Sequence, residues 1–393
     1  MLWVTSTNKK LTPIKSASFR GALVSSGVMA FAGMGDALLY PVLPVYGQDL
    51  GFSVLVIGLL LSVNRFVRIL ANTPIANTVN QFGMKKVLIT TAILATITTF
   101  FYGLELGLIS FLIARILWGL SYSGLKIATL NYAALTKKNS GMAFGFSQSI
   151  KTLGSFFVLW FGPIVISSYG FQIGFSIIAA LSSISIFLAL SLPKTSSEST
   201  EGKIETRRTF YPNTINILVF LLSITVDGIL VVTLSNLLAN DYTTPDKLLA
   251  IVAFYLLLKR LFVFSLSFIS SFLTLKIPTI KLFNIALIAT TTAIFLISFN
   301  FVITGIVIAF LFNPIIITYS PLVAIKIQSK KTNTLQAISS ISTWWDLGAA
   351  LGAFSGIFLI ETIGHQMLFL LLATFITITL ITYFYGDSNY SII

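Results

Sequence analysis

The chain has 393 residues, of which 56% are hydrophobic and only 9% are charged, with a formal net charge of +13 and a mean hydropathy of +0.94. A soluble globular protein carries about 25% charged residues, so this composition excludes a soluble domain and predicts an integral membrane protein. The chain has no cysteine, which excludes a disulfide framework and a thiolate metal site, and its single histidine, His365 in an expected external loop, excludes a histidine metal cluster.

Apolar runs of about twenty residues, long enough to cross a bilayer as a helix, recur along the whole chain. We place twelve spans at residues 21–46, 54–78, 87–104, 108–130, 141–166, 171–192, 213–238, 248–273, 282–299, 301–324, 334–360 and 366–386. Barrel strands would be shorter and alternating, so the predicted fold class is all-α integral membrane. The first span exceeds signal-peptide length and has no small-residue cleavage site, so we expect a retained helix.

Basic residues are distributed unevenly between the two sets of loops. Seventeen lie in the N-terminal segment and in the alternate loops that begin with residues 79–86, whereas the opposite loops contain only Lys247. The positive-inside rule then places both termini in the cytoplasm, and we expect the cytoplasmic (inner) membrane as the location. Cytoplasmic loops also explain the net positive charge without any binding of nucleic acid.

The longest polar stretch, residues 193–212, separates six spans from six. We predict that it is a flexible linker between an N-terminal half, residues 1–192, and a C-terminal half, residues 213–393. A shift of 194 residues places Arg65 on Lys259, and other positions of the second and fifth helices agree at the same shift. Two halves related by a parallel repeat, with a site at the bilayer midplane, are typical of a secondary transporter.

Ten ionisable residues lie inside the predicted spans, where a charge costs roughly 2.5 kcal/mol or more. They are Asp36, Arg65, Arg68, Arg115, Lys126, Lys151, Asp227, Lys259, Arg260 and Asp346. Charges at such depth face a watery cavity or one another. Seven are basic and three are acidic, so the spans carry a formal charge of +4, which favours an anionic substrate.

Each half has an acid on its first helix, Asp36 in the N-terminal half and Asp227 in the C-terminal half. Asp36 follows a glycine, and Asp227 precedes one. Each is either a protonatable or cation-pairing group that faces the cavity or a member of a structural ion pair. For Asp36 the partner in the second case is Arg65 or Arg68. These two arginines are three residues apart and share a helix face, so they either contact the substrate or compensate Asp36.

Lys259 and Arg260 are consecutive and point about 100° apart, and the repeat favours Lys259 as the cavity-facing residue. Lys151 lies mid-way along the fifth span, beyond the reach of either interface, which favours a cavity role. Asp346 either pairs with Lys151 or carries a proton. Trp345 either stacks on a substrate or packs against a neighbouring helix.

The loop after the second span reads NQFGMKK at residues 80–86. It is similar to the D-R-x-G-R-R-R loop of the major facilitator superfamily, with Asn80 at the acidic position and Gln81 at the first basic one. This departure weakens the gating ion pair that the family forms there. The resemblance to that family covers nearly the whole length of the chain.

Two helical segments carry the resemblance further. RILWG, residues 115–119, is similar to the family's fourth-helix R-x-x-x-G segment, and DLGAALG, residues 346–352, is similar to the eleventh helix of bacterial members. The resemblance implies twelve helices in two six-helix pseudo-symmetric halves, and for Arg115 a place in the cavity with a role in substrate binding or coupling.

The expected function is secondary active transport of a small organic anion by alternating access with proton coupling, and not enzymatic catalysis. The anion is a carboxylate, a polycarboxylate siderophore or a phosphorylated metabolite. The expected substrate-binding residues are Arg65, Arg68, Arg115, Lys151, Lys259 and Trp345, and the expected proton-coupling or gating residues are Asp36, Asp227 and Asp346. The chain acts as a monomer with the anion, protons and the lipid bilayer as its partners, and without a cofactor or metal.

Two alternatives remain open at this point. Multidrug efflux by proton antiport predicts an acidic cavity and a full fifth-helix glycine motif, and most of those glycines are absent. A non-transporting sensor or scaffold predicts that no intramembrane charge affects the flux of any ligand. The chain has no G-x-x-x-x-G-K-[ST] loop, which argues against transport driven by ATP.

Overall fold

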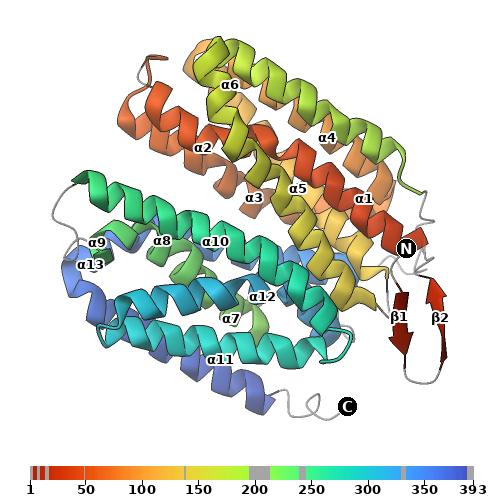
Figure 1. Ribbon diagram of the computed structural model, residues 1–393, viewed down its shortest axis with the longest axis vertical. Helices are drawn as coiled ribbons and strands as arrows, with labels where there is room; N and C mark the ends of the chain where they lie inside the picture. The colour runs from red at the N-terminus through yellow and green to blue at the C-terminus, as the bar shows by residue number, and fades with distance from the viewer. Residues whose placement is uncertain are drawn as a thin grey trace. The chain divides into compact units, whose positions relative to one another are not determined.

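The computed structural model describes residues 3–6, 9–13, 17–47, 49–136, 139–193, 213–238, 245–328 and 333–386. Long apolar helices make up nearly all of this chain (Figure 1). The expected linker 193–212 lies outside the described residues except for Pro193, as do many of the loop lysines and arginines on which the predicted orientation depends.

The helices that precede the linker are α1 (Ala17–Ala32), α2 (Met34–Tyr46), α3 (Val54–Phe82), α4 (Met84–Gly103), α5 (Gly107–Ala134) and α6 (Ser140–Leu190). A short antiparallel hairpin, β1 (Trp3–Ser6) with β2 (Lys9–Pro13), comes before them and pairs Val4 with Thr12. This hairpin was not predicted from the sequence, because its strands are too short to stand out against runs of twenty apolar residues.

The helices that follow the linker are α7 (Thr214–Leu222), the π-helix η2 (Ser223–Ile229), α8 (Leu230–Val232), α9 (Leu234–Leu238), α10 (Pro245–Leu273), α11 (Thr279–Ser298), α12 (Val302–Gln328) and α13 (Thr334–Gly386). The predicted span 213–238 is therefore one α-helix that passes through a π-helical turn and ends in two short helical pieces. A π-helical turn is rare and occurs frequently at functional sites.

Eleven segments of the described chain are long and apolar enough to cross a membrane. One of them is the 51-residue α6, which Gly170 divides with a φ of 82°, just as Gly364 with a φ of 75° divides α13. Counting α6 as two helices gives the twelve predicted spans, so the all-α integral membrane fold class is confirmed. Asn300, with a φ of 67°, makes the predicted turn between α11 and α12.

The chain forms two compact units. Unit 1 consists of Met1–Leu61 and Ile75–Gly202, and unit 2 consists of Ser62–Pro74 and Lys203–Ile393. The ends of α3 thus belong to unit 1, whereas its middle stretch, Ser62–Pro74, belongs to unit 2. The division into halves at residues 193–212 stays a prediction.

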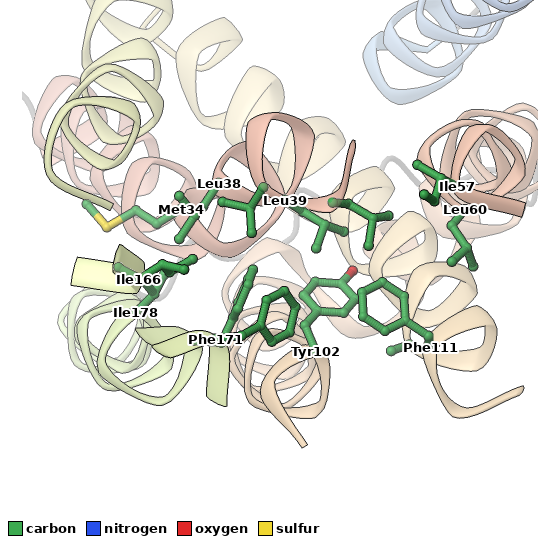
Figure 2. Close-up of a cluster of buried hydrophobic side chains, with 14 of the residues drawn as sticks. Met34, Leu38, Leu39, Ile57, Leu60, Tyr102, Phe111, Ile166, Phe171 and Ile178 are labelled. Carbon is green, nitrogen blue, oxygen red and sulfur yellow. The ribbon is translucent and has the colours of Figure 1, made fainter. Parts of the chain in front are cut away.

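Unit 1 has a hydrophobic core to which every helix from α2 to α6 contributes. Figure 2 shows Leu38 and Leu39 of α2 facing Phe171 of α6 and Tyr102 of α4. The Tyr102 ring stacks on Phe111 of α5 with 5.1 Å between the ring centroids. Tyr102 belongs to this core, and its hydroxyl lies 3.4 Å from Nη1 of Arg115 on α5.

Glycines give the two units the same helix contact. In unit 1, a Cβ on Gly154 of α6 would overlap the backbone of Ala30 on α1, and in unit 2, a Cβ on Gly348 of α13 would lie 2.5 Å from the carbonyl oxygen of Phe220 and 3.0 Å from the amide nitrogen of Ile224. Gly154 and Gly348 differ by 194 in number, as do Ala30 and Ile224. The 194-residue shift therefore relates the contact at Gly154 in unit 1 to the contact at Gly348 in unit 2. Small residues allow membrane helices to approach this closely.

Replacing Gly154 with alanine is expected to destabilise the protein by about 1–3 kcal/mol, because the added methyl group overlaps backbone that cannot move aside. The matched control is Gly58→Ala on α3, where an added Cβ has open space and alanine favours the helix by about 0.5–1 kcal/mol. Thermal unfolding in detergent measures both variants. Equal midpoints for the two would contradict the assigned contact.

Candidate substrate and coupling site

The first charged centre lies in unit 1 and consists of Asp36 on α2 and Arg115 on α5. The Arg115 side chain is fully buried, and its Nη1 donates to Oδ1 of Asp36 in an ion pair. Arg115 Nε donates to the carbonyl oxygen of Leu60 at 2.7 Å, and Nη2 donates to that of Leu61 at 3.3 Å. The guanidinium thus joins three helices and uses all three of its nitrogens.

Aromatic rings complete the surroundings of Arg115. The Tyr102 hydroxyl accepts from Nη1 at 3.4 Å, and the guanidinium carbon lies 5.8 Å and 5.9 Å from the ring centroids of Tyr40 and Tyr102. An arginine is the residue suited to such a place, because its planar guanidinium stacks on rings while it donates in several directions. Asp36 thus has Arg115 as a partner, a residue that was not considered for it from the sequence.

The second charged centre lies in unit 2 and contains Asp227 of η2. Lys259 Nζ on α10 donates to Asp227 Oδ1 at 2.6 Å, and Asn313 Nδ2 on α12 donates to the same oxygen at 3.1 Å. The Lys259 ammonium also lies 5.2 Å from the ring centroid of Phe310. The side chains of Asp227 and Lys259 are each 16% exposed, so neither is fully buried.

A third centre, also within unit 2, joins the middle of α3 to α13. Arg68 Nη2 lies 3.6 Å from Asp346 Oδ1, and Asn72 Nδ2 donates to Asp346 Oδ2 at 3.2 Å. The sequence left Asp346 between a pair with Lys151 and a proton carrier, and in the structure Arg68 is a basic partner of this carboxylate. Trp345 next to it is half-buried, and its carbonyl oxygen accepts from the Ser223 hydroxyl at 2.7 Å.

The remaining basic residues of the spans differ in their surroundings. Lys151 on α6 and Arg65 on α3 are half-buried, and neither has a hydrogen bond or an ion pair with any described residue. The charge of Lys126 on α5 lies close enough to that of Lys151 to repel it. Arg260, by contrast, is exposed on α10. The ten intramembrane charges thus resolve into three ion pairs, two half-buried cations without partners, the exposed Arg260 and Lys126.

The loop that resembles the family's D-R-x-G-R-R-R motif makes a different contact here. Asn80 and Gln81 are exposed, whereas Lys85 Nζ donates to the carbonyl oxygens of Leu190 at 2.7 Å and Leu192 at 2.5 Å. A lysine at the C-terminal end of a helix satisfies carbonyls that have no partner inside the helix. Lys85 therefore holds the loop to the end of α6 inside unit 1.

Four uncharged polar residues that take part in these centres were not among the predicted site residues: Tyr40, Asn72, Tyr102 and Asn313. Each is an uncharged polar group inside an apolar span, and the sequence analysis weighed mainly charged residues. His365, expected in a loop, begins the second helical part of α13 after Gly364, and its Nε2 lies 3.0 Å from Asn300 Oδ1. It lies away from the three charged centres in sequence and touches none of their residues.

The family model of the Major Facilitator Superfamily matches residues 26–330. Among solved structures, the chain is similar to a variant of the E. coli fucose:proton symporter FucP, with a TM-score of 0.73 and 13% identity over 92% of this chain and 97% of that one. It is also similar to the human organic anion transporter MFSD10 (TETRAN), with a TM-score of 0.69 and 14% identity over 94% of this chain and 99% of that one.

A structure of FucP in the outward conformation gives a TM-score of 0.69 and 14% identity over 92% of this chain and 98% of that one. No curated protein sequence matches the chain. These low identities carry the fold alone, and the family model, which spans most of the chain, carries the membership. The chain belongs to the Major Facilitator Superfamily and is a multi-pass membrane transporter of that family.

Proposed function

We propose that the protein is a secondary active transporter that moves a small organic anion by alternating access, coupled to protons. The observation that supports this function most strongly is the balance of charge among the described residues. Each of the three acids in the spans has a basic partner, namely Arg115 for Asp36, Lys259 for Asp227 and Arg68 for Asp346. The half-buried cations Lys151 and Arg65 are left without one.

A cation without a partner inside a membrane protein is costly, because burial removes water and nothing replaces it. Such a group is retained where an anion from outside completes it. Lys126 near Lys151 adds to the positive field at that place. The substrate of this proposal is therefore an anion, such as a carboxylate, a polycarboxylate siderophore or a phosphorylated metabolite, and Arg65 and Lys151 are its first proposed contacts.

Proton coupling follows from the same ion pairs. When a proton binds Asp227 or Asp346, the neighbouring Lys259 or Arg68 loses its anionic partner and becomes available to an anion. Proton binding and anion binding would then favour each other. The names of the similar structures agree with this pairing of functions, since one is a fucose:proton symporter and the other an organic anion transporter.

The remaining parts of the proposal concern the setting of the protein. We propose that both termini lie in the cytoplasm, because basic loop residues collect on one side of the membrane. We also propose that the protein is a monomer in the inner membrane. Trp345 remains a proposed substrate contact. Multidrug efflux of cations is the second candidate, but the acids that would receive a cation are already paired with bases.

Charge removal at the unpaired cations tests the proposed function. Lys151→Gln and Arg65→Gln are expected to abolish uptake of the anion in proteoliposomes. Each removes a positive charge that pairs with no described residue and is proposed to attract the anion. Lys151→Arg keeps the charge and should retain part of the activity. The matched control is Arg260→Gln, an exposed intramembrane cation, which should transport normally. Wild-type uptake of every anionic candidate by both Gln variants would sink the proposal.

Stability should separate a structural cation from a functional one. Arg115→Met is expected to cost about 3–5 kcal/mol, because it removes the fully buried guanidinium that binds Asp36 and the carbonyls of Leu60 and Leu61. Lys151→Met is expected to leave stability unchanged or raise it, because it removes a half-buried charge that has no partner. Thermal unfolding in detergent gives both values, and a loss at Lys151 as large as that at Arg115 would refute the distinction.

An imposed pH gradient tests the coupling. A gradient that is acidic outside is expected to drive accumulation of the anion by the wild type. Asp227→Asn and Asp346→Asn each remove one site that the gradient can protonate, so at least one of them should exchange anion across the membrane but not concentrate it. The measurement is counterflow beside gradient-driven uptake, and full gradient-driven accumulation by both variants would contradict the assignment of these acids.

A further inference from the structure

The centre around Asp227 has acceptor atoms that no donor fills. Lys259 and Asn313 both donate to Asp227 Oδ1, so Asp227 Oδ2 has no partner among the described residues. Asn313 is 1% exposed, and its Oδ1 is buried without a hydrogen-bond partner. Exchanging the positions of Oδ1 and Nδ2 of Asn313 would not remove this unpaired acceptor, because Oδ1 would then face the Asp227 carboxylate. A buried acceptor without a donor costs about 1–3 kcal/mol.

The same centre also has donors that no acceptor fills. The Lys259 ammonium carries three N–H groups, and its only hydrogen-bond partner in the described chain is Asp227 Oδ1, with the Phe310 ring beside it. The Lys259 side chain is 16% exposed, so it is not fully buried. Unfilled donors and unfilled acceptors thus lie around a single carboxylate group.

The corresponding centre of unit 1 lacks these deficits. Arg115 donates to Asp36, to Tyr102 and to the backbone carbonyls of Leu60 and Leu61, so all three of its nitrogens are in use. No buried atom of Asp36 or Arg115 lacks a partner. Both centres begin with an acid on the first helix of the repeat, but among the residues described for them the buried oxygen without a donor, Asn313 Oδ1, belongs to the one in unit 2.

The backbone around Asp227 supports a binding role. Asp227 lies in η2, and a π-helical turn of this kind is frequent at functional sites. Its neighbour Gly228 is held against α13, since an added Cβ would lie 2.6 Å from Cα of Gly352. The carboxylate is therefore carried by a backbone segment that close packing fixes in place.

We propose that Lys259, Asp227 and Asn313 bind the head of a hydroxycarboxylate, in which a hydroxyl group stands next to a carboxylate. The carboxylate accepts from the free N–H groups of Lys259, and the hydroxyl donates to the buried Asn313 Oδ1. A plain carboxylate fills only the donors, and a neutral alcohol fills only the acceptors. This inference rests on the proposed function and narrows its substrate class from organic anions to hydroxylated ones.

Pairs of ligands that differ only in the hydroxyl test the inference: lactate against propionate, malate against succinate, and citrate against propane-1,2,3-tricarboxylate. Binding to the purified full-length protein is measured by thermal shift and by competition for uptake. The hydroxylated member of at least one pair is expected to bind about tenfold or more tightly, because its hydroxyl supplies a donor to a buried acceptor that otherwise has none. This comparison needs no variant, so a folding defect cannot obscure it.

A variant then locates the discrimination. Asn313→Leu should reduce the preference to within about twofold to threefold, because it removes the buried acceptor while nearly keeping the side-chain volume. The matched control is Asn216→Leu, since Asn216 is also 1% exposed and also has a buried Oδ1 without a partner, but lies outside the centre. The control should keep the preference of the wild type.

The outcomes separate this inference from the proposed function. If both members of every pair bind equally well, water fills the acceptors and the inference falls, while anion transport stands. A preference that survives in folded Asn313→Leu overturns the assignment of the hydroxyl to this site. If no member of any pair binds and no anion is taken up, the proposed function fails together with the inference.

Discussion

The cost of placing charge inside an apolar helical protein governs this structure. Water cannot solvate a buried guanidinium or carboxylate, so each must find its partner within the protein or carry the cost of lacking one. Arg115 shows the first solution, since its three nitrogens are taken up by Asp36, Tyr102 and two backbone carbonyls. Lys151 shows the second, because it has no such partner in the described chain.

The two repeats use the same requirement to different ends. Each places an acid on its first helix and connects that acid to the second and fourth helices. In unit 1 the cation comes from the fourth helix and is an arginine, which stays protonated and donates in several directions. In unit 2 the cation is Lys259 of the second helix, and the fourth helix supplies only the amide of Asn313. The first arrangement is suited to holding helices together and the second to exchanging partners.

The helix α3 connects these arrangements through the covalent chain. Its residues Leu60 and Leu61 provide the carbonyls that Arg115 binds in unit 1, and Arg68, seven residues later, pairs with Asp346 in unit 2. Pro74 closes the stretch that belongs to unit 2, and a proline removes one hydrogen bond from the helix interior. Helix α3 thus contributes residues to both units, and it lacks one backbone hydrogen bond at Pro74, where the chain returns to unit 1.

The sequence by itself determined the class of the protein, the number of spans and which charged residues lie inside the spans, including those of the three charged centres. It could do so because length, hydropathy and charge along the chain depend on local composition alone. It also indicated the repeat, through the 194-residue shift that the contacts of Gly154 and Gly348 share. Only the tertiary structure decided which charge meets which. Asp36 and Arg115 are 79 residues apart, and Asp346 and Asn72 are 274 apart. Hydropathy and spacing do not encode a pairing over such distances, because it depends on how helices rotate about their axes when they pack, and the uncharged Asn313 acquires its importance only from that packing.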